Sequence, residues 1–244
     1  MKRLKLSAND GTPDFPAAVG VVSAIIVFSC LISLAAFKFP GIAAEPVFAI
    51  MLGLFGTSLI TAVLLCYVFA RFGGYLISIL KPPVFPFIRK GLRIYLLFLP
   101  LLFLIALLSS VFFKSMGLEA MPQQIFAVYM QADSFYVLFS MFFLSCIAAP
   151  FAEEVIFRGV IYTALKEKFS VPSAIIISSL LFALLHNEIF QIGALFAFGI
   201  LLAYIFEKHD NLWLSISVHF FNNLFANAAI FLIKYAGITE KVIL

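Results

Sequence analysis

The feature of this sequence that most constrains its fold is a series of long apolar runs separated by short polar segments. Apolar residues make up 64% of the chain and charged residues only 11%, less than half of the share of about 25% that is usual in soluble domains. So few charges could not cover the surface of a soluble fold, whereas a chain embedded in a bilayer needs no such cover. A spanning helix needs roughly 20 predominantly apolar residues. Runs of this kind lie at about 17–37, 46–70, 94–113, 135–152, 172–187, 189–206 and 211–233.

These runs predict an all-α fold, a polytopic transmembrane helix bundle of about seven spans. The fourth run continues as a helix to about residue 168, and an eighth span results if this helix breaks at Pro150. Pro150 removes the hydrogen bond to the carbonyl of Cys146 and is expected to kink the helix. We divide the chain into N-terminal transmembrane helices (1–134), a core that carries the polar motifs (135–234) and a C-terminal tail (235–244).

The distribution of Lys and Arg predicts the orientation of the bundle. The N-terminus is expected inside, at the inner membrane of a bacterial cell, with the longest inner loop at about 71–93 and the longest outer loop at about 114–134. The formal net charge of +4 is then loop charge that meets anionic lipid headgroups, and no nucleic-acid partner is expected. The inner side carries Lys2, Arg3, Lys5, Arg71, Lys81, Arg89, Lys90, Arg93, Lys166, Lys168 and Lys208, and the outer side only Lys38, Lys114, Lys234 and Lys241.

The first polar cluster inside an apolar run is APFAEEVIFRG, at 149–159. Ionisable residues within a span are costly and by default mark a functional site. Glu154 and Arg158 are four residues apart and share a helix face, so Glu154 is the natural partner of a buried arginine. Glu153 is turned about 100° away and has no obvious local partner, which suits a general base. The alternative is that all three residues form a structural ion-pair network.

Two further clusters lie nearer the C-terminus. Phe182 and His186 are four residues apart in the run 178–188, where a lone histidine could equally be a core residue that bonds between helices. The third cluster is a polar stripe on one face of the last run, and a hydrogen-bonded helix interface would explain one or two of its members. The stripe consists of Ser215, His219, Asn223 and Asn227.

Together these residue types suit hydrolysis. A carboxylate and imidazoles can deprotonate water, and an asparagine amide can donate to a developing oxyanion. The same histidines and glutamates could instead hold a metal that acidifies a bound water. The motifs of other hydrolase classes are missing: the sequence has no H-E-x-x-H, no G-x-S-x-G, no Walker A motif and no Asp in the core of a span.

The three clusters, E-E-x-x-x-R at 153–158, F-x-x-x-H at 182–186 and H-x-x-x-N at 219–223, resemble the CPBP family in order and separation. This family comprises the type II CAAX prenyl endopeptidases and bacterial relatives linked to bacteriocin processing and immunity, and the resemblance covers about residues 135–230.

The resemblance implies an intramembrane endopeptidase in which Glu153 activates water together with His186. It assigns His219 and Asn223 to oxyanion stabilisation, and Glu154 and Arg158 to supporting positions. The family is often labelled a metalloprotease, with a metal-free, glutamate-dependent mechanism as the competing view. Two histidines and one or two glutamates leave a divalent metal such as zinc open, and we expect none that is tightly bound.

The expected substrate is a membrane-associated or lipid-modified peptide, or a lipoprotein. A non-catalytic membrane scaffold or bacteriocin-immunity protein of the same family is the main alternative. A proton-coupled transporter is a third, although transporters usually show repeated halves and the polar residues here lie in the C-terminal half alone. The oligomeric state stays open.

Overall fold

A computed structural model describes residues 11–38, 46–82, 84–118 and 124–236, and every regular element in these ranges is helical. The predicted all-α membrane helix bundle is confirmed. The elements are α1 (Phe15–Lys38), α3 (Pro46–Ile79), α4 (Phe85–Ser115), α5 (Gln124–Gln131), α6 (Phe135–Phe143), η1 (Leu144–Ala148), α7 (Ala149–Glu154), η2 (Val155–Tyr162), α8 (Thr163–Lys168), α9 (Val171–Leu185), η3 (Ile189–Gln191), α10 (Ile192–His209) and α11 (Leu212–Tyr235).

Within the described ranges, several helices have the length and composition to cross a membrane. Five qualify fully: Gly56–Ile79, Phe85–Ser115, Phe135–Lys168, Ile189–His209 and Leu212–Tyr235. Two shorter apolar helical stretches, Phe15–Ser29 and Val171–Leu185, accompany them. The seven apolar runs of the sequence therefore all correspond to helices.

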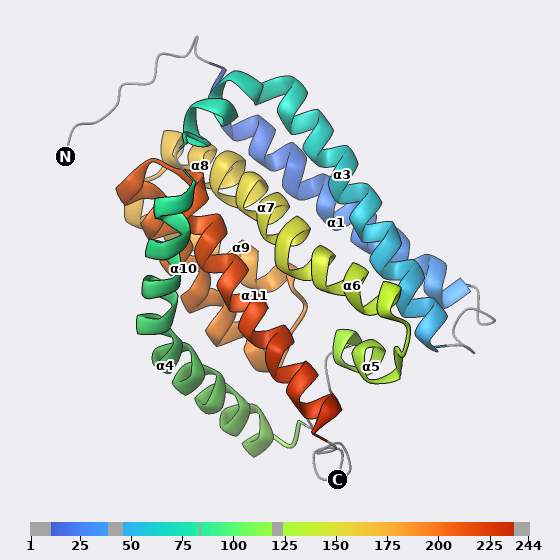
Figure 1. Cartoon of the computed structure of the whole chain (residues 1–244). Helices are drawn as coiled ribbons and strands as arrows, with labels where there is room; N and C mark the ends of the chain where they lie inside the picture. Colours follow the sequence, from blue (N-terminus) through green and yellow to red (C-terminus); the bar gives the residue numbers. More distant parts are fainter. Residues whose placement is uncertain (1–10, 39–45, 83, 119–123, 237–244) are drawn as a thin grey trace.

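The stretch Phe135–Lys168 forms one long helix through the middle of the bundle. Figure 1 shows α1 and α3 side by side along one side of this helix, and α4, α9, α10 and α11 on the other. The helix does not break at Pro150, so the alternative with an eighth span is wrong. Two π-helical segments, η1 and η2, lie on either side of α7, and α7 carries the glutamate pair.

The predicted inner loop at 71–93 is wrong in extent, because α3 and α4 extend through most of it. The short connection between α3 and α4 is held by residues at the start of α11. Asn211 Nδ2 donates to the carbonyl of Lys81 at 2.9 Å and Trp213 Nε1 to that of Leu80 at 3.1 Å. These bonds satisfy carbonyls that the end of α3 leaves without a helical partner.

The predicted outer loop at 114–134 contains a helix, α5, whose contacts hold it against α3 and α11. Lys234 Nζ donates to the carbonyls of Tyr129 and Ala132 at the C-terminal end of α5, where a cation also complements the helix dipole. Some residues used for the topology prediction lie outside the described ranges: Lys2, Arg3, Lys5, Lys241 and most of the tail 235–244.

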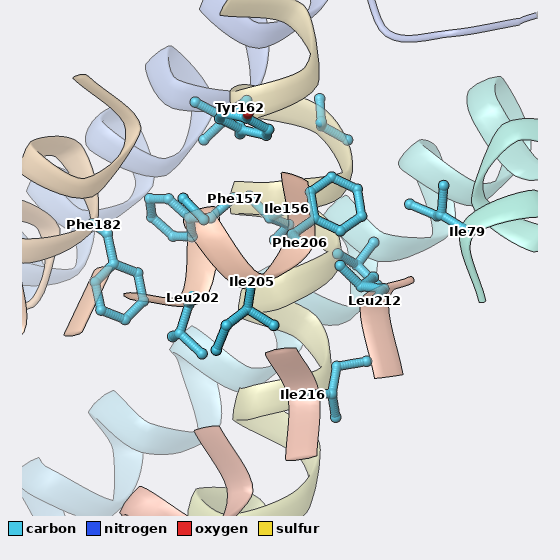
Figure 2. Packing of buried hydrophobic residues seen from close by; sticks show 14 of the residues in the cluster. Ile79, Ile156, Phe157, Tyr162, Phe182, Leu202, Ile205, Phe206, Leu212 and Ile216 are labelled. Atoms are coloured by element: carbon cyan, nitrogen blue, oxygen red, sulfur yellow. The ribbon is translucent and has the colours of Figure 1, made fainter. Parts of the chain in front are cut away.

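The core packs around the middle of the long helix, where side chains from η2, α9, α10 and α11 meet (Figure 2). Close approach of α9 and α10 depends on Gly199, where an added Cβ would lie 2.9 Å from Ser179 Cβ and 3.1 Å from its Cα. Small residues at such contacts are typical of helix packing in membranes. The labelled members of the cluster are Ile79, Ile156, Phe157, Tyr162, Phe182, Leu202, Ile205, Phe206, Leu212 and Ile216.

Candidate active site

Glu154 and Arg158 form a buried ion pair beside the site, as the spacing of the first cluster predicts. Arg158 Nη1 donates to Glu154 Oε1 at 3.1 Å, and the two side chains are 2% and 0% exposed. Arg158 Nη2 donates to the carbonyl of Gly199 at 3.2 Å, and the guanidinium lies 4.6 Å from the centroid of the Phe182 ring. The charge of Arg158 is thus matched by a carboxylate, a carbonyl and an aromatic face, which a buried guanidinium requires.

Glu154 also contacts His219, the histidine of α11. His219 Nδ1 lies 2.9 Å from Glu154 Oε1, and His219 is almost fully buried. Since the carboxylate accepts this hydrogen bond, Nδ1 carries a proton and Nε2 is free to face the opposite way. Phe198 and Phe182 pack edge-on against the ring at centroid distances of 5.4 and 5.9 Å. The ring is therefore fixed in position by groups from three other helices.

Glu153 turns away from the ion pair, towards both histidines. Its Oε2 lies 3.5 Å from His186 Nε2 and 3.8 Å from His219 Nε2, and it has no hydrogen-bond partner among the described residues. The Glu153 side chain as a whole is 28% exposed. A carboxylate oxygen without a direct partner, between two imidazoles, is placed to bind a water or another polar group.

His186 is the cap residue that follows the C-terminal end of α9, and its ring orientation is set by a local contact. Nδ1 lies 2.6 Å from the carbonyl of Phe182, one turn earlier. Because a carbonyl can only accept, Nδ1 is the donor and Nε2 faces Glu153. The Phe182 ring lies 4.3 Å from the His186 ring, centroid to centroid. Phe182 therefore contacts both histidines and Arg158, which accounts for the F-x-x-x-H spacing.

Asn223 is fixed by the irregular helix that precedes the glutamates. Its Nδ2 donates to the carbonyl of Ser145 at 2.8 Å. In the π-helical turn η1, Ala149 N donates to the carbonyl of Leu144, so the next donor, to Ser145, would be residue 150. Proline has no N–H, and the carbonyl of Ser145 is left for Asn223. The sequence prediction placed the freed carbonyl at Cys146, which assumes an α-helical register that this turn does not have.

The polar stripe of α11 divides into a site part and a structural part. Ser215 Oγ donates to the carbonyl of Leu202 at 3.2 Å. At the other end, Asn227 Oδ1 accepts from Tyr129 and, at 3.3 Å, from Ser145 Oγ. These three bonds are helix-interface bonds, as the structural alternative predicts, whereas His219 lies at the carboxylates and Asn223 follows one turn later on the same face.

A cavity of about 240 Å³ opens next to Glu153 and His186. Its other walls come from α1 and α3, including Thr57 and Thr61. The spacing of the sequence motifs gives no indication of this contribution, because α1 and α3 carry no ionisable residue in their apolar cores. The carbonyls of Gly199 and Ser145 are likewise site elements that the sequence does not reveal, since any residue type supplies a carbonyl.

A zinc site is the alternative that the sequence leaves open, and the donors can be tested for fit. A catalytic zinc needs three protein ligands in close tetrahedral arrangement. Among the described residues, no three His, Cys, Asp or Glu side chains are grouped so that they could hold a metal ion. Glu153, His186 and His219 are of the residue types that bind zinc but are not grouped as such a ligand set, and the reaction proposed below has no step through a metal.

The fold and this site define a polytopic membrane protein whose carboxylate and histidines meet inside a helix bundle. Comparison with known proteins then gives a family match over part of the chain. Residues 133–225 match the family model described as Type II CAAX prenyl endopeptidase Rce1-like, and this segment contains every predicted site residue. The resemblance to the CPBP family is thereby confirmed over this segment.

A curated relative supports the same relationship. The chain is 33% identical over 85 residues to YdiL of Bacillus subtilis (strain 168), whose name marks it as a candidate membrane peptidase. The match covers 35% of this chain and 35% of that protein, so it spans about a third of the relative's length. No solved structure matches the chain. The family description names a CAAX prenyl endopeptidase and the relative's name a membrane peptidase, so both matches are to peptidases.

Proposed function

We propose that the protein is an intramembrane endopeptidase that hydrolyses a peptide bond with a water activated by Glu153 and His186. The observation that carries this proposal is the position of Glu153 Oε2. It is buried without a hydrogen-bond partner among the described residues, 3.5 Å from His186 Nε2. The Glu153 and His186 residues both line the cavity, so a water bound there lies next to both of them.

The proton balance of the reaction requires one acceptor and one donor. Glu153 takes a proton from the attacking water while the oxygen of that water bonds to the carbonyl carbon. The same proton then passes to the departing amine as the C–N bond breaks. The products are a new carboxylate and a new amine. His186, held by the carbonyl of Phe182, orients the water through its Nε2.

The developing oxyanion needs donors fixed in advance. Asn223 Nδ2 has two hydrogens, of which one goes to the carbonyl of Ser145. The other is available to the oxyanion. His219 can donate from Nε2 only when its ring carries a proton on both nitrogens, because Nδ1 is already the donor to Glu154. Asn223 is therefore held in place by the carbonyl of Ser145, and His219 by Glu154. Neither of these two partners takes part in the proposed reaction.

We further propose that the substrate is a membrane-associated or lipid-modified peptide, with lipid as the surrounding partner. The apolar helices around the cavity leave an elongated chain, rather than a folded domain, as the form that can approach Glu153. The location we propose is a bacterial inner membrane with the N-terminus inside, which is the orientation that the Lys and Arg distribution favours.

The test of this function is the chemistry of the products. Purified protein in phosphatidylcholine vesicles would be incubated in ¹⁸O-labelled water with membrane-anchored peptides of varied sequence, and the products analysed by mass spectrometry. A peptidase yields two fragments, with one ¹⁸O in the new carboxylate of the N-terminal fragment. A non-catalytic scaffold leaves every peptide intact.

A further inference from the structure

The wall of the cavity opposite Glu153 and His186 comes from α1 and α3, which lie outside the segment matched by the family model. Each helix contributes residues from a single face. The residues from α3 are Thr57, Ile60, Thr61 and Leu64, and those from α1 are Ile25, Phe28 and Ser29. Spacings of three and four place side chains next to one another on a helix, so both helices present one continuous face to the cavity.

This wall runs from an open end to a closed end. Phe28 is 40% exposed, whereas Leu64 is 9% exposed. Thr61 lies between these extremes in exposure, one turn before Leu64 on the same face. The cavity therefore has a mouth and a floor, and Leu64 limits its depth.

Size and charge restrict what the cavity can hold. Its volume of about 240 Å³ equals roughly eight water molecules at ~30 Å³ each. This space accommodates the attacking water with one or two side chains of a bound peptide, and no folded segment. Glu153 and His186 are the charged or titratable side chains among its lining residues, and the rest are apolar or carry hydroxyls. A charged peptide side chain would find no side chain of opposite charge in this lining outside the reacting groups.

We propose that this α1–α3 wall is the binding subsite for the residue next to the scissile bond, with Thr61 setting its width and Leu64 its depth. The substrate is then a membrane-anchored peptide with an uncharged, small or medium-sized apolar residue at that position. This proposal rests on the proposed peptidase function. It goes beyond that function because it assigns selectivity to helices that carry none of the catalytic motifs.

The first test is a change of selectivity. Thr61→Phe narrows the subsite and Leu64→Ala deepens it, while Val63→Phe adds the same ring at a position that is 60% exposed and absent from the cavity lining. Peptides with Gly, Ala, Val, Leu or Phe next to the cleaved bond are compared by kcat/KM. Thr61→Phe is expected to shift preference at least tenfold towards Gly and Ala, Leu64→Ala towards Phe, and Val63→Phe not at all. Unchanged preference in folded Thr61→Phe protein overturns the proposal.

The second test needs no cleavage. A photoreactive phenylalanine analogue is placed in turn at each position of an uncharged, membrane-anchored peptide, which is then crosslinked to wild type and to Glu153→Gln in phosphatidylcholine vesicles. Labelling of α1 and α3 residues of the wall, abolished by Thr61→Phe and retained by Val63→Phe, supports the subsite. Labelling that does not depend on Thr61, or none on these helices, overturns it. Wild type that labels the wall but cleaves nothing overturns the peptidase function and with it the assignment to a scissile bond, and leaves the wall as a peptide-binding surface alone.

Discussion

Glu154 Oε1 accepts hydrogen bonds from two buried groups at once, Arg158 Nη1 at 3.1 Å and His219 Nδ1 at 2.9 Å. The ion pair that the E-E-x-x-x-R spacing predicts is therefore also the support of a site histidine on another helix. Since Arg158 Nη2 in turn donates to the carbonyl of Gly199, α10 is joined to the same network. Glu154 and Arg158 thus hold His219 in place, while Glu153 on the neighbouring face stays available for the proposed chemistry.

Replacing Glu154 should therefore reduce both stability and activity. Glu154→Gln leaves Arg158 buried without a counter-charge, and breaking a buried pair costs about 3–5 kcal/mol. It also weakens the hydrogen bond that orients His219, so kcat should fall at least tenfold. Thermal unfolding in detergent and cleavage kinetics measure the two effects. Glu167→Gln, on the same long helix but exposed, is the control and should change neither. Wild-type kcat in Glu154→Gln would remove Glu154 from the positioning network.

The contact between Gly199 and Ser179 should be sensitive to a single methyl group. Gly199→Ala places a Cβ 2.9 Å from Ser179 Cβ and 3.1 Å from its Cα, so α9 and α10 must separate at a cost of about 1–3 kcal/mol. Ser179→Gly should restore part of the loss. Gly73→Ala is the matched control, because an added Cβ there meets nothing within 4 Å. Equal melting temperatures for the two alanine variants would show that this contact does not limit the packing.

Replacing Pro150 should lower activity without lowering stability. In Pro150→Ala a new N–H at residue 150 can bond to the carbonyl of Ser145 and displace Asn223, or restore an α-helical turn that rotates Glu153. We expect kcat to fall at least tenfold while the melting temperature is unchanged or raised, because proline inside a helix costs about 3 kcal/mol. Pro100→Ala, in the interior of α4 and on its exposed side, should raise stability alone. Full activity in Pro150→Ala would contradict this role of the π-helical turn.

The outer end of the polar stripe should be structural. Tyr129→Phe removes the hydroxyl that donates to Asn227 Oδ1, which still accepts from Ser145 Oγ at 3.3 Å. A loss of about 1 kcal/mol in the free energy of unfolding is expected, the usual net value of one hydrogen bond, with kcat within twofold of wild type. Tyr136→Phe, at an 81% exposed position, should leave both unchanged. A large fall in kcat in Tyr129→Phe would extend the site to α5.

Sequence patterns predict the long helices and the ion pair because both depend on local spacing. Apolar runs mark spans through their length, and a four-residue step places Glu154 beside Arg158 whatever the tertiary fold. The helical extensions of α3 and α4 into residues 71–93 were missed, since charged and proline-containing segments resemble loops. There the bonds from Asn211 and Trp213 to the carbonyls of Lys81 and Leu80 come from more than 100 residues away.

The meeting of the site residues could be expected only from the family resemblance. Nothing in the spacing of 153, 186 and 219 requires that Glu153 face both histidines, or that Glu154 bind His219. The roles of backbone groups were not predictable, because the carbonyls of Ser145 and Gly199 are exposed to side chains by a π-helical turn and a close helix contact. The α1–α3 wall was missed for a related reason: its residues are ordinary for a membrane span, and their importance comes from what they face.

The most direct measurement is the cleavage of membrane-anchored peptides by wild type and Glu153→Gln, with Glu167→Gln as control and the melting temperature of all three recorded. The change removes the proton acceptor while keeping the size of the side chain. Wild type and Glu167→Gln should cleave alike, and Glu153→Gln should fold but lose at least a hundredfold in kcat, because general-base catalysis typically contributes 10²–10⁴-fold. Equal cleavage by a folded Glu153→Gln protein would contradict the proposed mechanism and assign the polar cluster to structure.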